Sequence, residues 1–231
     1  MGDNILTMIK VIELPIDKDM GGLTSYVLQL YRMIDKKEFE LTLLSYDDSQ
    51  NFDVNYNVET VSRPYHIIQF YKKMKCLLSE EKNIIHFHQS YVNIIPILIA
   101  KLAGFKTIIL HAHSSSIDDN RKIVRFLKTG LHKVGRFLLP YLVDTYIGCS
   151  TKASEWMFPR KCIDSDSYYL LHNAIDLDLY DRNINLGLEV RQKFNIPKDA
   201  LVVGHIGRFT PVKNHPFIID IFKEVLKQNP N

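Results

Sequence analysis

The stretch NIIHFHQSYVNIIPILIAKLAGFKTIILH (residues 83–111) decides the fold predicted for this chain. Two short apolar runs, 83–88 and 106–111, flank a helix-like segment, 92–103, which ends at Gly104. Short β-branched strands that alternate with helical patterns are typical of βαβ units and a parallel sheet. The stretch therefore predicts an α/β fold built on a parallel sheet.

The same alternation continues along most of the chain. It predicts strands at residues 5–16, 39–45, 58–62, 83–88, 106–111, 143–148, 168–172 and 201–206, and helices at 23–34, 65–78, 92–103, 120–139, 151–158, 186–194 and 215–228. The polar passage 173–185 is the predicted boundary between a domain at 1–172 and a shorter piece at 173–231. That piece holds one predicted strand–helix unit, which is too little to build a sheet and core of its own.

The composition is that of an ordinary soluble globular protein, with 231 residues, 46% of them hydrophobic and 24% charged. The net charge of +3 is too small to argue for nucleic acid as a partner. Cys76, Cys149 and Cys162 are odd in number and widely spaced, which indicates a reducing compartment. We see no signal-peptide cleavage site and no apolar run near the roughly 20 residues of a membrane span. We therefore expect a cytoplasmic location.

Two cations follow the predicted strand in VVGHIGRFTPVKN (202–214). The layout presents Arg208 and Lys213 at the carboxyl end of a strand, where open α/β sheets bind ligands. Arginine offers a planar fork of donors and lysine a compact charge, so the pair suits a diphosphate. The alternative is a solvated turn with two ordinary surface charges.

Gly21 and Gly22 lie between the first predicted strand and the first predicted helix. Glycine lets backbone N–H groups approach a ligand closely, and the helix N-terminus adds partial positive charge. The pair is not the G-x-G-x-x-G dinucleotide fingerprint. A plain tight turn is the alternative.

Four histidines, His86, His88, His111 and His113, occur as two H-x-H pairs at two predicted strand ends. Residues two apart on a strand share a face, so the pairs could converge on zinc or a similar metal. No carboxylate or cysteine lies close to either pair along the chain. The alternative for His86 and His111 is that they are buried histidines whose hydrogen bonds are satisfied. For His113, in a loop just past the strand, we expect a substrate contact, for which a histidine can serve as hydrogen-bond donor.

The helix predicted at 121–137 has a basic side and an apolar side. At about 100° per residue the two kinds of side chain fall on opposite arcs, and no acidic residue occurs from 121 to 143. The basic residues are Arg121, Lys122, Arg125, Lys128, His132, Lys133 and Arg136, and the apolar ones are Ile123, Val124, Phe126, Leu127, Leu131, Val134, Phe137 and Leu138. This pattern is typical of an interfacial helix attracted to an anionic membrane surface. The alternative is a helix that packs its apolar side on the sheet and leaves its basic side solvated.

Six ordered segments resemble the retaining glycosyltransferases of family 4, which have the two-domain GT-B fold. The segments are GGLTSYVLQL (21–30), IIHFHQS (84–90), TIILHAHSSS (107–116), DTYIGCSTKASEWM (144–157), HNAIDLDLY (172–180) and VVGHIGRFTPVKN (202–214). The HAHSSS form is most similar to bacterial capsule and exopolysaccharide transferases. The resemblance implies a Rossmann-like, doubly wound acceptor-side domain, followed by the first strand–helix unit of a donor-binding domain.

The resemblance also implies roles for single residues. Arg208 and Lys213 would bind the diphosphate of a nucleotide-sugar donor and stabilise the departing nucleotide, with no metal or other cofactor. His113 would contact the reacting sugar. Other implied substrate-binding residues are Gly21, Gly22, His111, Asn173 and Asp176, the last two at the domain junction. Ala174 replaces the family's usual glycine, which puts a tight turn there in question.

The implied function is retaining transfer of a hexose to a glycan or polyprenyl-diphosphate-linked acceptor, in bacterial surface polysaccharide synthesis at the inner face of the plasma membrane. The family's second domain extends further and carries an E-x7-E motif, so we expect a fragment or a truncated chain. Val202, Val203 and Ile206 would then lack sheet neighbours, and we expect poor solubility or local disorder beyond about residue 185. A catalytically inactive remnant and a metal-dependent hydrolase using the H-x-H pairs are the alternatives.

Overall fold

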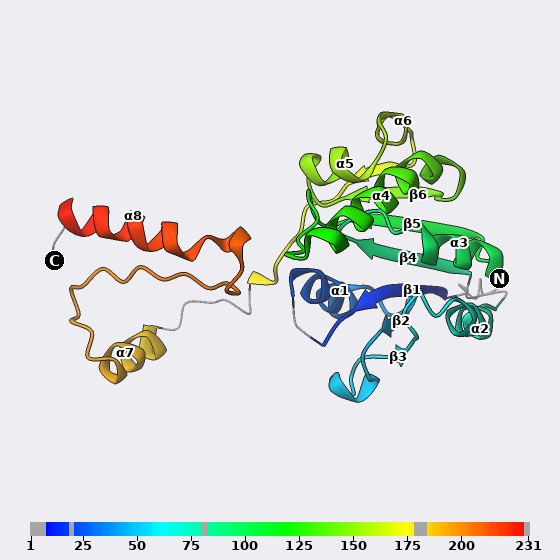
Figure 1. The fold of residues 1–231 in the computed structure, drawn as a ribbon. Helices are drawn as coiled ribbons and strands as arrows, with labels where there is room; N and C mark the ends of the chain where they lie inside the picture. Colours follow the sequence, from blue (N-terminus) through cyan, green and yellow to red (C-terminus); the bar gives the residue numbers. More distant parts are fainter. Residues whose placement is uncertain (1–7, 19–20, 80–82, 178–183, 229–231) are drawn as a thin grey trace. The chain divides into compact units, whose positions relative to one another are not determined.

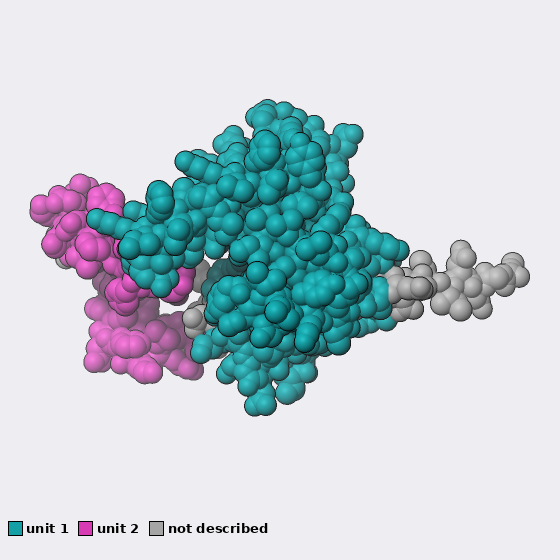
Figure 2. Space-filling model, turned by 45° about the vertical axis from the view of Figure 1, so that its right-hand side comes forward, with its two compact units in different colours: residues 1–175 teal, residues 176–231 magenta. Residues whose placement is uncertain are grey.

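The computed structural model describes residues 8–18, 21–79, 83–177 and 184–228. The chain forms two compact units, residues 1–175 and 176–231, which are coloured separately in Figure 2. The division follows Ile175, near the boundary predicted after residue 172. The acceptor-side and donor-side roles given to the two parts stay predictions.

The first unit is built around a parallel sheet (Figure 1). Its strands are β1 (Ile9–Ile16), β2 (Phe39–Ser45), β3 (Val58–Thr60), β4 (Ile84–Gln89), β5 (Thr107–Ala112), β6 (Thr145–Gly148) and β7 (Tyr168–Leu170). Among the described residues this is one seven-stranded sheet in the order β3-β2-β1-β4-β5-β6-β7, and every pairing is parallel. The predicted α/β fold with a parallel sheet is therefore confirmed. The strand order reverses between β1 and β4, which makes this the topological switch point.

Helices connect the strands at nearly the predicted places. They are α1 (Gly22–Met33), α2 (Ile67–Leu77), α3 (Ile94–Ala103), α4 (Lys122–Leu138), α5 (Thr151–Met157) and α6 (Arg160–Ile163), with α7 (Ile184–Lys193) and α8 (His215–Gln228) in the second unit. The Asn93 side chain accepts a hydrogen bond from the backbone N–H of Ile95 and begins α3. Gly104 ends α3 with a φ of 109°, a left-handed conformation that favours glycine. The short helix α6 was not predicted.

Two clusters of buried apolar residues cover the two faces of the sheet. Consecutive residues of a strand point to opposite faces, and Val11 of β1 belongs to one cluster while Ile12 belongs to the other. Val27 of α1 packs with Val11, whereas Phe70 of α2 and Ile97 of α3 pack with Ile12. Helix α1 therefore covers one face, and α2 and α3 cover the other.

The strand predicted at 201–206 is wrong. These residues are irregular, and the described part of the second unit contains no strand. A strand needs a neighbour to accept and donate its backbone hydrogen bonds, and none is present among residues 184–228. Val202, Val203 and Ile206 are 55%, 61% and 100% exposed, so the predicted lack of sheet neighbours is confirmed. The expected poor solubility stays a prediction.

Two glycines of α4 give a matched test of how this helix packs. A Cβ added at Gly135 would overlap the Val92 side chain and lie 3.3 Å from the Val92 carbonyl oxygen. A Cβ added at Gly130 would meet no atom within 4 Å. We expect Gly135→Ala to lower the free energy of unfolding by about 1–3 kcal/mol and Gly130→Ala to raise it by about 1 kcal/mol. Urea unfolding of the two variants checks this, and equal effects at both sites would contradict the packing.

Candidate functional site

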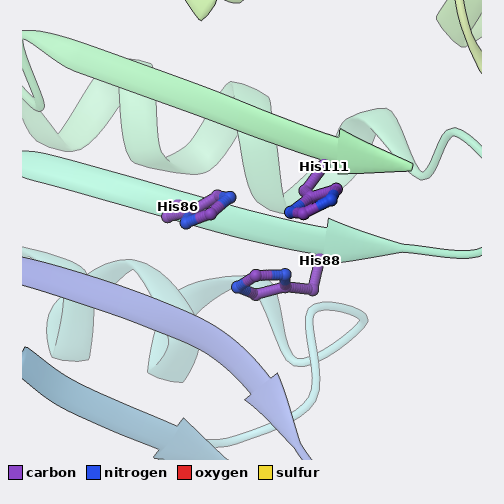
Figure 3. A group of neighbouring side chains, drawn as sticks. All are labelled: His86, His88 and His111. Atoms are coloured by element: carbon purple, nitrogen blue, oxygen red, sulfur yellow. The ribbon is translucent and has the colours of Figure 1, made fainter. Parts of the chain in front are cut away.

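The candidate site lies at the carboxyl ends of β1, β4 and β5, beside the switch point between β1 and β4. The strand register pairs Glu13 with His86 and His88 with His111. Glu13, His86 and His88 alternate with residues of the α2–α3 core, so they point to the face that α1 covers. Figure 3 shows the rings of His86, His88 and His111 gathered together. The two H-x-H pairs therefore meet, as the sequence suggested they could.

Glu13 completes this group, and the sequence analysis missed it. Its carboxylate lies 2.6 Å from Nε2 of His88 and 3.0 Å from Nδ1 of His86, and the residue is 2% exposed. Burial opposes ionisation of Glu13, but the charges and hydrogen bonds of His86 and His88 lower its pKa to about 2. The observation that no carboxylate is close to either pair holds only along the chain, because β1 brings Glu13 to both histidines. A carboxylate inside the apolar strand IKVIELPI was the available signal.

His113 is connected to Glu13 through His88. Nδ1 of His88 lies 2.8 Å from Nε2 of His113, which is partly buried. Burial, and then the neighbouring His88 and His86, lower the pKa of His113 to about 2. Burial also lowers the pKa of His88 to about 4. Both rings are therefore neutral at pH 7.

Tyr26 of α1 covers these rings from the other side. Its ring centroid lies 5.1 Å from those of His111 and His113 and 6.0 Å from that of His88. Burial, and then the charge of Glu13, raise the pKa of Tyr26 to about 12. Nothing in the spacing of the sequence pointed to this tyrosine.

His86 and His111 are buried, as the alternative interpretation predicted, but in the described part of the chain only Nδ1 of His86 has a hydrogen-bond partner, Glu13. Neither ring nitrogen of His111 has a hydrogen-bond partner among the described residues, and neither does Nε2 of His86. The two rings stack with centroids 5.5 Å apart. Burial, and then the nearby His113 and His88, lower the pKa of His111, so this ring is held neutral.

Three histidines of the group could be considered as metal ligands. One nitrogen from each of His86, His88 and His111 lies within 4.8 Å of the others (Figure 3). Both nitrogens of His88 are already in hydrogen bonds, with Glu13 and His113, and Nδ1 of His86 lies against Glu13. Among these three residues, only His86 and His111 keep a nitrogen that makes no hydrogen bond to the described residues, so a metal held by all three would have to replace a hydrogen bond of His88. The metal-dependent hydrolase stays an alternative prediction.

Gly21 and Gly22 lie at the start of α1, which covers the sheet face that carries Glu13, His86 and His88. Gly21 precedes the helix in an extended conformation and Gly22 is its first residue. A Cβ at Gly22 would meet no atom within 4 Å, so packing inside the protein does not require glycine there. A ligand contact at this helix start stays a prediction.

The other predicted site residues lie near the boundary or in the second unit. Asn173 is exposed after β7, and Asp176 begins the second unit. Arg208 and Lys213 are exposed on one loop, with Lys213 ending a short 3₁₀ turn, Pro211–Lys213. The structure brings these two cations onto one loop, and their role as diphosphate ligands stays a prediction.

Four members of the predicted basic arc of α4 make contacts with other parts of the protein. His132 is 2% exposed and its Nδ1 accepts the backbone N–H of Val92. Arg136 donates to the carbonyl oxygens of Trp156 and Phe158 at the end of α5. Lys128 pairs with Asp119, 2.8 Å away, as does Arg121. Placing His132 on a solvated arc was wrong, and the assignment of Arg136 to a membrane surface is corrected because its guanidinium caps α5.

Most of the apolar arc of α4 faces solvent, whereas Leu131 and Leu138 pack against the core. The alternative in which this side packs on the sheet therefore holds only for part of the arc. Among the described residues of α4, only His132 and Gly135 are buried. The exposed apolar residues, which we call the α4 stripe, are Ile123 (76%), Phe126 (77%), Leu127 (63%), Val134 (58%) and Phe137 (72%). Lys122, Arg125 and Lys133 on the same helix are also exposed. Among the described residues, no helix is both long and apolar enough to cross a membrane.

Comparison with known proteins identifies the class. The model of Glycosyltransferase Family 4 matches residues 20–179, more than half of the chain. The chain therefore belongs to glycosyltransferase family 4.

Two curated relatives match nearly the whole chain. EpsF of Bacillus subtilis (strain 168), named as a glycosyltransferase, is 25% identical over 232 residues, which cover 92% of this chain and 57% of EpsF. The UDP-Gal:alpha-D-GlcNAc-diphosphoundecaprenol alpha-1,3-galactosyltransferase of Escherichia coli is 20% identical, with 96% and 59% covered. This chain thus spans less than two thirds of the length of either relative. Among solved structures, MurG of Acinetobacter baumannii is 11% identical with a TM-score of 0.47, covering 72% of this chain and 46% of MurG.

Proposed function

We propose that this chain takes part in transferring a hexose from a nucleotide-diphosphate sugar to a glycan or polyprenyl-diphosphate-linked acceptor, with retention of configuration. The observation that carries the proposal is the position of His113. In a family 4 chain it is held, partly exposed, at the carboxyl edge of the sheet next to the switch point. Open α/β sheets bind their ligands at this place. The names of both relatives describe glycosyltransferases, and one acts on a lipid-linked sugar.

The proposal gives each residue a role. His113 contacts the reacting sugar, and Asn173 and Asp176 are further substrate-binding residues, whereas His111 is fully buried. Arg208 and Lys213 stabilise the negative charge of the departing nucleotide diphosphate, so no metal is required. Fixed cations aimed at developing charge act without reorganisation during the reaction.

The transferase proposal is tested with the substrates that name the E. coli relative, UDP-galactose and GlcNAc-diphosphoundecaprenol. We expect a galactosylated product whose new linkage has the α configuration of the donor. Arg208→Ala and Lys213→Ala are each expected to lower kcat by roughly 10²–10³-fold, the usual effect of removing one such donor. Lys223→Ala, on the exposed surface of α8, is the matched control.

The assay separates the alternatives. No transfer with several nucleotide sugars, combined with retained vesicle binding, would favour an inactive chain that keeps only a binding role. Product of inverted configuration would contradict retention while leaving the transferase intact.

We also propose that α4 lies on the anionic inner face of the plasma membrane. The α4 stripe leaves two phenylalanines, Phe126 and Phe137, more than 70% exposed. Burying such a side chain contributes about 1.5–3 kcal/mol, and each nearby lysine adds about 1 kcal/mol on an anionic surface. Lys122, Arg125 and Lys133 supply that charge. The occupant we favour is therefore lipid, because the stripe combines apolar area with positive charge.

Vesicle co-sedimentation tests this surface. We expect binding to vesicles containing anionic phospholipid, weaker binding to neutral vesicles, and a loss of affinity of at least about tenfold for each of Phe126→Asp and Phe137→Asp. Ile68→Asp on α2, where Ile68 is 68% exposed, makes the same change in charge away from α4. Equal binding to neutral vesicles would contradict the electrostatic part of the proposal. An equal loss of vesicle affinity in Ile68→Asp would contradict the assignment of the binding surface to α4.

A further inference from the structure

Two successive hydrogen bonds connect buried Glu13 through His88 to His113. A carboxylate oxygen of Glu13 lies 2.6 Å from Nε2 of His88, and Nδ1 of the same ring lies 2.8 Å from Nε2 of His113. Glu13 is 2% and His88 1% exposed, whereas His113 is only partly buried. The connected hydrogen bonds therefore begin at a buried carboxylate and end at a ring on the edge of the sheet.

The chemistry of each group fixes where the protons lie. An ionised carboxylate can only accept, so Nε2 of His88 must donate to Glu13. A neutral imidazole that carries its proton on Nε2 has a bare Nδ1, which accepts. Nε2 of His113 must then donate to His88. One carboxylate thus selects the tautomer of two rings.

We propose that Glu13 and His88 are positioning residues that hold His113 as the Nε2–H tautomer, so that its Nδ1 presents a lone pair to a hydroxyl group of the sugar. The part about the sugar rests on the proposed function, and the tautomer does not. His113 is then an acceptor for substrate and not the donor expected from the sequence. No protein partner of Nδ1 of His113 is found among the described residues.

The opposite proton order requires a charged ring. If His88 carried two protons, its Nδ1 would donate to His113 and the tautomer of His113 would reverse. His86 lies beside His88 with centroids 4.2 Å apart, and His111 is 5.4 Å away. Burial, and then the charge of His86, disfavour a second proton on His88, whose pKa is lowered to about 4. Glu13, with its pKa near 2, stays ionised and favours the single proton on Nε2.

Histidine NMR of the ¹⁵N-labelled chain at pH 7 tests the proton order without any sugar or turnover. We expect a scalar coupling between Nδ1 of His88 and Nε2 of His113 through the hydrogen bond, with the proton bonded to the His113 nitrogen. His113→Gln and His88→Gln assign the signals. His66→Gln is the control, because His66 is exposed at the start of α2, and it should leave these signals unchanged. A proton bonded to Nδ1 of His88, or no coupling between the rings, would overturn the proposal.

The role of Glu13 is tested by removing its charge. In Glu13→Gln the side chain can donate as well as accept, so the fraction of His113 protonated on Nε2 is expected to fall. Glu13→Ala gives a second reading if the glutamine variant folds poorly. An unchanged fraction in both variants would show that Glu13 does not set the tautomer.

The substrate contact has its own readout. When UDP-galactose is bound, as judged by shifts elsewhere in the chain, the ¹⁵N signal of Nδ1 of His113 should move in the direction of a hydrogen-bonded acceptor. An unmoved signal would reject the hydroxyl contact and leave the tautomer assignment standing. If the tautomer is found but no sugar is transferred, the proposed function alone fails.

Discussion

Lowering the pH from 7 to 5 is expected to reduce the free energy of unfolding of the first unit by roughly 4–6 kcal/mol through three histidines of the candidate site, and by about 2 kcal/mol more through His132. The cause is a set of buried histidines that fold without a proton. The pKa of His88 is lowered to about 4 and that of His113 to about 2, both first by burial, and the pKa of His111 is lowered in the same way. In the unfolded chain each of these rings titrates near its ordinary value, about 6.5.

The sign follows from which state binds more protons. Below about pH 6.5 the unfolded chain takes up a proton on each ring and the folded chain does not, so acid favours unfolding. Each such ring contributes a slope of about 1.4 kcal/mol per pH unit. The pKa of Glu13, lowered to about 2, adds a further loss only below its ordinary value of 4.5. Stability is therefore full near neutral pH and falls on the acid side.

Urea unfolding at several pH values measures this slope. His132 on α4 also has its pKa lowered to about 4, by burial and then by the charge of Arg136. His132→Gln should lower the slope of the free energy of unfolding against pH by roughly 1.4 kcal/mol per pH unit, the contribution of one histidine. The contribution of His88, His111 and His113 to that slope should remain. A wild-type stability that is flat between pH 7 and 5 would contradict neutral histidines in the folded protein.

The sequence predicted the sheet well because strands and helices have different periods. Apolar runs placed β2 at Phe39–Ser45 and α8 at His215–Gln228 with the observed bounds. The failure at 201–206 has a physical cause. An apolar, β-branched run shows that a strand could form, but pairing requires a neighbour, and none is present in the described part of the second unit.

The candidate site was predicted only in part because its parts are far apart along the chain. The spacing of His86, His88, His111 and His113 showed that the pairs could converge, but Glu13 is 73 residues away from His86. Only the register between β1 and β4 brings them together. In the sequence Glu13 is a single charged residue within an apolar strand. Local patterns do not indicate which residues it contacts.

The orientation of α4 shows a different limit. Helical periodicity separates an apolar arc from a basic arc, but it does not say which arc meets the protein. Gly135 lets the helix approach Val92 closely, and His132 fills the contact with a hydrogen bond to the Val92 backbone. The face with Gly135 and His132 therefore meets the protein, and the α4 stripe is exposed although Leu131 and Leu138 pack against the core.

Replacing Glu13 by alanine is expected to lower the free energy of unfolding by about 3 kcal/mol or more at pH 7, because hydrogen bonds to a charged group are worth about 1.5–3 kcal/mol each. Glu13 accepts from both His86 and His88, and the alanine variant leaves these nitrogens buried without a partner. Removing the carboxylate also relieves the cost of burying it, so the loss is smaller than the sum of the two bonds.

A double-mutant cycle separates these contributions. Glu13→Ala and His88→Ala are combined, and urea unfolding gives the coupling energy, expected at about 1–3 kcal/mol for groups in one hydrogen-bonded network. Glu13→Gln is the conservative comparison, since it keeps the shape and one hydrogen bond and should lose less than alanine. Because Glu13 is buried in the sheet and linked to His113 through His88, additive losses would mean that the carboxylate supports the strands alone. A measurable coupling would mean that the same group stabilises the fold and holds the site histidines in place.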